Sequence, residues 1–164
     1  MIGQIHAAIE ALLTGDAPFV ADLLALNLGS DGSAVAPQLL LSLRDPRQVP
    51  QQKFPALLVE KGNADTEALS DTGSEFSVIG FSQQGMATDV LVGLIWHQPD
   101  PVVAYRQRTG LETAFVDLFL RHPDPGGATL AWTRRIDFDR GALHPTQTAL
   151  VTVRVEYAQQ RSNR

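Results

Sequence analysis

The stretch Thr88–Arg121, TDVLVGLIWHQPDPVVAYRQRTGLETAFVDLFLR, decides the fold. Over residues 88–96 the side chains alternate between the two faces of an extended chain. One face is apolar and carries Val90, Val92, Leu94 and Trp96. The other is mixed and carries Asp89, Leu91, Gly93 and Ile95. Alternation with a period of two predicts a strand that is buried on one side.

A corner and a helix follow this strand. Asp100 is placed as an N-cap, and Pro101 suits the first helical position because its missing N–H would have no partner there. Apolar residues then recur at steps of three and four, as the buried stripe of a helix requires. They are Ala104, Leu111, Ala114, Phe115 and Leu118. The predicted helix ends at Arg121-His122-Pro123.

Two more helices are predicted near the N-terminus. Residues 2–14 place their isoleucines and leucines on one helical face, and Gly15 ends this helix. A second, shorter helix is predicted from Ala17-Pro18, with Gly29 as its stop. Further on, Gln38–Leu43 is a short apolar run that fits a strand or a helix equally well.

The remaining elements are predicted to be strands. They are residues 54–60, 75–82, 129–138 and 148–157. Gln83-Gln84-Gly85 is predicted to turn the strand 75–82 back into the strand 88–96 as a hairpin. In the strand 129–138, the apolar side is expected to carry Leu130, Trp132, Ile136 and Phe138, with Arg134 interrupting it. Asp124-Pro125-Gly126-Gly127 is predicted to be a turn.

Together these elements predict an α+β fold. Short connections favour a mostly antiparallel sheet of about five strands, with helices packed on one face and the other face open to solvent or a partner. We expect residues 1–164 to form a single domain. Its predicted parts are an N-terminal helix at 2–14, a variable excursion at 17–52, the sheet and central helix at 53–158 and a frayed tail at 159–164.

Composition excludes several classes of function. The chain has 164 residues, 44% of them hydrophobic, with a net charge of −5 and no cysteine. The acidic balance argues against a general nucleic-acid binder, and the lack of cysteine excludes disulfides and thiolate metal sites. We see neither a signal peptide nor an apolar run long enough to span a bilayer, so a soluble protein made in the cytoplasm is expected, without a membrane partner.

One motif suggests an enzyme. Gly80-Phe81-Ser82-Gln83-Gln84-Gly85 resembles the nucleophile elbow of α/β hydrolases, and the order Ser82, Asp137, His144 matches the order of their catalytic triad. However, the second glycine is one place late, and the residues after Gly85 alternate like a strand where an elbow requires a helix. A plain β-hairpin turn is therefore the preferred interpretation, and a small serine hydrolase remains the alternative.

No other constellation of residues predicts catalysis. The histidines, His6, His97, His122 and His144, show none of the spacings of a metal site. We therefore predict no catalytic, cofactor-binding or metal-binding residues. Charged residues on loops and on the last two strands are instead candidates for contact between subunits. They are Asp71, Glu75, Arg134, Arg135, Arg140 and Arg154.

The order of elements, with a few typical sequence words, resembles the tail terminator (tail completion, head–tail joining) proteins of long-tailed bacteriophages and phage-tail-like particles. The words are Phe-Pro-Ala-Leu-Leu-Val-Glu at 54–60, Thr-Asp-Val-Leu-Val-Gly-Leu-Ile-Trp at 88–96 and Thr-Ala-Leu-Val-Thr-Val-Arg-Val-Glu-Tyr at 148–157. The resemblance covers most of residues 1–14 and 53–158. The segment 17–52 is longer than expected for that family, which leaves open another neck or minor tail adaptor protein.

The resemblance implies a structural role in a virion. It implies a hexameric ring that caps the tail tube, stops tube polymerisation and joins the tail to the head connector. The implied partners are further copies of the chain, the tail tube protein, the head–tail connector protein, and DNA that passes through the lumen without sequence-specific binding. The implied location is the virion tail, assembled in the host cytoplasm, and no cofactor is implied.

The strand at 88–96 gives a direct test of the predicted core. Val92→Asp would place an unpaired charge in the sheet interior, at a cost of several kcal/mol. We expect this variant to be unfolded or insoluble, as measured by circular dichroism and solubility after expression. A soluble variant with native-like secondary structure would contradict the assignment of this strand to the core.

Overall fold

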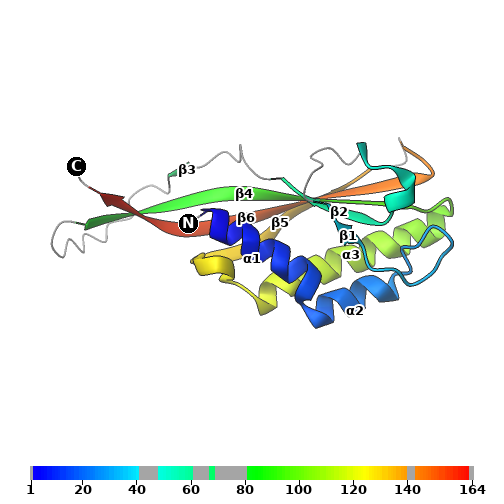
Figure 1. The fold of residues 1–164 in the computed structure, drawn as a ribbon, viewed down its shortest axis with the longest axis horizontal. Helices are drawn as coiled ribbons and strands as arrows, with labels where there is room; N and C mark the ends of the chain where they lie inside the picture. The colour runs from blue at the N-terminus through cyan, green and yellow to red at the C-terminus, as the bar shows by residue number, and fades with distance from the viewer. Residues whose placement is uncertain (1, 41–47, 61–66, 69–80, 140–142, 163–164) are drawn as a thin grey trace.

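The computed structural model describes residues 2–40, 48–60, 67–68, 81–139 and 143–162. In this part of the chain the helices lie on one face of a long, twisted sheet, giving a two-layer arrangement (Figure 1). The predicted α+β class is confirmed, as are the mostly antiparallel sheet and the helices on one face.

The helices are α1 (Ile2–Gly15), α2 (Ala17–Ala25) and α3 (Pro101–Arg121). The predicted start of α3 is confirmed, because the Asp100 carboxylate accepts hydrogen bonds from the amides of Val102 and Val103 at 2.8 and 3.2 Å. These bonds satisfy two of the N–H groups that have no partner within the helix.

The sheet runs in the order β1-β2-β4-β6-β5, and β3 pairs with β4 beside this path. Its strands are β1 (Gln38–Leu39), β2 (Ala56–Val59), β3 (Glu67–Ala68), β4 (Phe81–His97), β5 (Leu130–Phe138) and β6 (Thr146–Ser162). All pairs are antiparallel except β1 with β2. The apolar run at Gln38 therefore begins as a strand, and residues 41–43 lie outside the described residues.

The predicted hairpin turn at Gln83-Gln84-Gly85 is wrong. These residues lie inside β4, which continues without a turn from Phe81 to His97 and pairs with β6 along its whole length. The expected frayed tail is also wrong for residues 159–162, which are the β6 partners of residues 81–84. Backbone pairing between the two strands has overridden the local turn and tail signals. Residues 75–80 of the predicted hairpin lie outside the described residues.

The main core lies between the sheet and the helices. Alternate residues of the two central strands face the helix layer, which confirms the apolar face predicted for the strand 88–96. Those residues are Val90, Val92, Leu94, Trp96, Ala149, Val151, Val153, Val155 and Tyr157. They pack against apolar side chains of all the helices, among them Ile5, Ile9, Phe19, Leu23, Leu111 and Phe115.

One buried amide joins three elements inside this core. The Trp96 indole N–H of β4 donates to Gln107 Oε1 of α3 at 2.9 Å. Gln107 Nε2 in turn donates to the carbonyl oxygens of Leu26 and Asn27, just after α2, at 3.1 and 3.2 Å. The Gln107 side chain, itself buried, thus satisfies the buried indole and two partly buried carbonyl groups at the end of α2 together.

The turn after α3 is confirmed and contacts α1. Residues Pro125–Gly127 form one turn of 3₁₀ helix, in which Gly126 has a φ of 62°. A side chain at this position would place its Cβ atom 2.6 Å from the backbone oxygen of Gln4. Glycine is therefore required both by its left-handed backbone and by the close approach of α1.

A bulge in β5 corrects its predicted apolar side. Thr133 pairs with Val153 but Arg135 pairs with Thr152, so Arg134 is an extra residue in the strand. In the middle of β5, the bulge changes which alternate side chains point towards the helices. Before it, Ala131 is buried while Leu130 and Trp132 are exposed; after it, Ile136 and Phe138 pack against the core. Leu130 and Trp132 therefore lie on the face of the sheet opposite the helices.

The helix-free face is partly covered near β2. Val49 and Phe54, from the segment before β2, pack with Ala56, Leu58 and Ile95 in a second, smaller apolar cluster. Val49 belongs to the excursion predicted at 17–52, whereas Phe54 belongs to the strand predicted at 54–60; Figure 1 shows the segment before β2 at the end of the sheet near β2. The remainder of that face, over β5, β6 and the middle of β4, carries the polar and exposed apolar side chains described below.

The Gln107 network gives a test of how the helix layer is held. Gln107→Leu keeps the size of the side chain but leaves the buried Trp96 indole without an acceptor and removes the donor to two partly buried carbonyl groups. We expect it to lower the free energy of unfolding by about 2–4 kcal/mol. Urea denaturation followed by tryptophan fluorescence would measure this, with Gln52→Leu, an exposed glutamine, as the matched control. Equal stability of the two variants would contradict the role assigned to Gln107.

Candidate interaction surfaces

The structure does not assemble the serine hydrolase triad considered from the sequence. Ser82 lies within β4, opposite Arg161 of β6, and no helix follows it as an elbow requires. Asp137 pairs with Leu150, which pairs with Gly93, roughly 35 Å along β4 from Ser82. His144 Nε2 lies 3.0 Å from the carbonyl oxygen of Pro99, also at the far end of the sheet. The three residues are therefore too far apart to act together.

Histidine and acidic side chains form no metal centre within the described ranges. There, no group of three or more histidine, cysteine, aspartate or glutamate side chains lies close enough to hold a metal ion. His6 is buried beside the core, and His122 contacts Asp16. No described helix is both long and apolar enough to cross a membrane.

Three of the predicted contact arginines lie on the helix-free face of the sheet. Arg134 and Arg154 both bind Asp89, with nitrogen–oxygen distances of 3.0 and 3.3 Å, so one carboxylate joins β4, β5 and β6. Arg135 binds Asp137 at 2.7 Å. The side chains of Arg134 and Arg135 remain largely exposed, which leaves most of their N–H groups free to face a partner. The other predicted contact residues, Asp71, Glu75 and Arg140, lie outside the described residues.

Exposed apolar side chains flank these arginines. Leu130 and Trp132 of β5 lie on one side of them, and Leu150 of β6 on the other. We call this set the sheet patch: Leu130, Trp132, Arg134, Arg135 and Leu150. Trp132 is 37% exposed, so part of its large apolar ring faces water when the chain is alone.

A second exposed apolar set lies on the opposite side of the molecule, on the outer face of α3. Tyr105 is 68% exposed and Leu120 is 73% exposed. Val102 and Val116 are also exposed, and Glu112 lies between the two apolar ends. These residues recur at helical spacing along one line. We call this set the helix stripe: Val102, Tyr105, Glu112, Val116 and Leu120.

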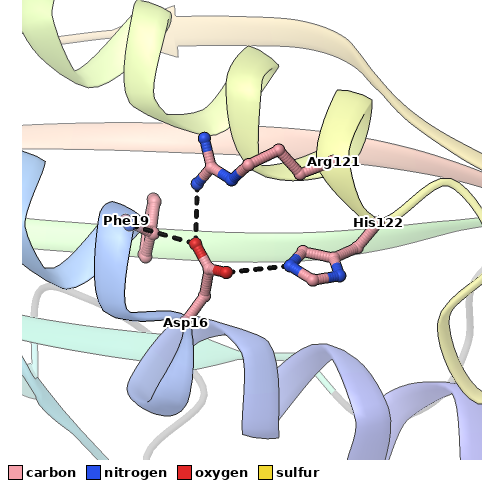
Figure 2. Close-up of polar contacts among 4 residues, drawn as sticks. All are labelled: Asp16, Phe19, Arg121 and His122. Atoms are coloured by element: carbon pink, nitrogen blue, oxygen red, sulfur yellow. Dashed lines mark hydrogen bonds and ion pairs between the residues drawn. The ribbon is translucent and has the colours of Figure 1, made fainter.

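A polar cluster fixes the position of α3 relative to the other helices (Figure 2). The Asp16 carboxylate accepts a hydrogen bond from the Phe19 amide at 3.0 Å and so caps α2. It also binds Arg121 at 2.6 Å and lies 2.8 Å from His122 Nε2, at the end of α3. Burial alone would raise the pKa of Asp16, but the hydrogen bonds from His122, Arg121 and Phe19, with the charge of Arg121, lower this pKa to about 2.

Sequence reasoning missed this cluster and both apolar surfaces. Asp16 had a local signal, since an aspartate directly before Ala17-Pro18 is a typical N-cap. Its contacts with Arg121 and His122 span over 100 positions and had no signal in a single sequence. His122 lies at the end of α3, against Asp16. The sheet patch was not predicted, because the bulge at Arg134 decides which side chains of β5 face away from the helices.

Comparison with known proteins gives a likeness of fold. No protein-family model and no curated protein sequence matches the chain. A chain in the solved structure "Virion of native gene transfer agent (GTA) particle" matches with a TM-score of 0.54 and 15% sequence identity. The match covers 94% of this chain and 94% of that chain, so the two share a fold over nearly their whole length.

The Asp16 cluster predicts a specific dependence of stability on pH. The pKa of Asp16 falls from 3.8 in an unperturbed aspartate to about 2 in the folded chain. A lowered pKa stabilises the fold above the unfolded value, and this contribution is lost as the pH falls from about 4 through about 2. Because Arg121 and His122 are partly exposed, we expect it to be about 1–2 kcal/mol.

Asp16→Asn would test this contribution, because asparagine keeps the N-cap and removes the charge. The difference in unfolding free energy between the wild type and Asp16→Asn should be full at pH 5 and should shrink towards pH 2. Asp22→Asn, at an exposed position of α2, is the matched control. A difference that does not change with pH would show that the charge of Asp16 contributes nothing.

Proposed function

We propose that this chain is a structural protein of a phage-like particle. In this proposal, copies of the chain form a ring on the end of the tail tube, stop its polymerisation and join the tail to the head connector. The observation that carries the proposal is the shared fold with a chain of a gene transfer agent virion, over 94% of both chains. The resemblance of residues 1–14 and 53–158 to tail terminator proteins, seen in the sequence alone, points the same way.

The arrangement of exposed surfaces supports a ring. A ring requires a heterologous contact, in which one surface of a subunit binds a different surface of the next. The chain has two such surfaces, the helix stripe and the sheet patch, on opposite sides of its two layers. A C2 dimer would instead bring the same surface of both copies together.

Charge is consistent with a channel for DNA. A chain with a net charge of −5 contributes little attraction to phosphates, and DNA would pass through a ring of such chains without being held. We propose that the partners are the tail tube protein on one side of the ring and the connector protein on the other. The proposed location is the virion tail, assembled in the host cytoplasm.

A related role has the same support. The printed description of the matched structure concerns the whole virion, and it fits another neck or minor tail adaptor equally well. Such an adaptor would have the same fold and would also bind its neighbours through exposed surfaces. The position of the chain along the tail distinguishes the two roles.

The location of the chain in purified particles tests the proposal. We expect electron microscopy of particles labelled with an antibody against the chain to show label at the junction of tail and head. We also expect cells that lack the chain to produce tubes of irregular length without heads. Label along the tube or at the distal tip, with tubes of normal length in the deletion strain, would overturn the proposal.

A further inference from the structure

We propose that the helix stripe of one copy packs against the sheet patch of the next copy. This inference rests on the proposed ring and names the contact that forms it. It would bury both of the exposed apolar sets that the chain leaves on opposite sides, and it would repeat from one subunit to the next. The argument depends on the order, the spacing and the charge of the two surfaces.

Both surfaces have the same order of side chains, with apolar groups at the two ends and charge in the middle. On α3, Val102 and Tyr105 form one end, Glu112 the middle, and Val116 and Leu120 the other end. On the sheet, Leu130 and Trp132 form one end and Leu150 the other. The arginines of β5, at positions 134 and 135, lie between these ends.

The inner apolar residues of the two surfaces are also separated by similar distances. Trp132 pairs with Arg154, and the step from Arg154 to Leu150 along β6 is roughly 13 Å. Tyr105 and Val116 are about 16 Å apart along the axis of α3. The apolar ends of the helix can therefore lie over the apolar ends of the sheet patch at the same time.

The charges in the middle are opposite. Glu112 is exposed on α3, and within the part of the chain that the structure describes no basic side chain forms an ion pair with it. Arg134 and Arg135 each bind one carboxylate of their own chain and keep most of their N–H groups towards solvent. A carboxylate that approaches between two arginines would complete their pairing, whereas two copies of the sheet patch facing each other would bring arginines against arginines.

Pairwise cross-linking tests the contact, because the chain contains no cysteine of its own. Single-cysteine variants would be made at four exposed positions, Tyr105, Leu120, Leu130 and Leu150. They would be mixed in pairs, allowed to assemble at high concentration, and treated with a short thiol-specific cross-linker. The product would be read as covalent dimers on a denaturing gel, and the assembly state by light scattering.

The expected pattern is reciprocal. Leu150→Cys should link to one of Tyr105→Cys and Leu120→Cys, and Leu130→Cys should link to the other, because the helix can lie in only one of two directions. No variant should link efficiently to itself. Ala11→Cys, at an exposed position of α1 outside both surfaces, is the matched control and should give at least tenfold less dimer with every partner.

The outcomes separate this inference from the proposed function. Rings that form without any of these cross-links would overturn the inference and leave the ring intact. Efficient linking of a variant to itself would overturn it in favour of a two-fold contact. A chain that stays monomeric at every concentration and is absent from the tail end of particles would overturn both.

A charge exchange gives a second, independent readout. Glu112→Arg should weaken self-association about tenfold, because it brings a third positive charge to Arg134 and Arg135. Combining Glu112→Arg with Arg135→Glu should restore association to within about threefold of the wild type. If the double variant associates no better than Glu112→Arg, Glu112 does not meet these arginines.

Discussion

The buried hydrogen bond between Trp96 and Gln107 is the interaction on which the layered structure depends. A tryptophan in the middle of a core supplies a large apolar ring, but its indole N–H must have an acceptor there. Gln107 provides this acceptor, and its amide group holds the end of α2 through two further bonds. This one polar side chain therefore joins the sheet, the central helix and the end of the second helix, while the Asp16 cluster joins α2 and α3 at the C-terminal end of α3.

Local signals in the sequence predicted the parts of the fold that local chemistry determines. The start of α3 follows from Asp100 and Pro101, and the alternation of the C-terminal strand follows from its valines. The length of β4 was missed because it depends on β6, which follows in the sequence only after α3 and β5. A turn signal such as Gln-Gln-Gly is weak, and the pairing of β4 with β6 along the whole length of β4 outweighs it.

The surfaces were harder to predict than the core. Three of the candidate arginines, Arg134, Arg135 and Arg154, lie on the last two strands, but their neighbours could not be predicted. The bulge at Arg134 exposes Leu130 and Trp132, and its position depends on the register between β5 and β6. The register between strands that are distant in sequence is set by the whole sheet, so no local sequence pattern predicts it. The same limit applies to Asp16, whose partners lie at the C-terminal end of α3, far from it in sequence.

The pairing of β4 with β6 has a consequence for the order in which the protein is made and folds. β6 is the last strand of the chain, yet it lies between β4 and β5 in the sheet. During synthesis β4 can pair with β2 as soon as it is made, but neither β4 nor β5 can pair with β6 until residues 146–162 have been added. Contacts between residues this far apart in sequence also form slowly. A chain that ends before β6 therefore lacks a central strand of its sheet.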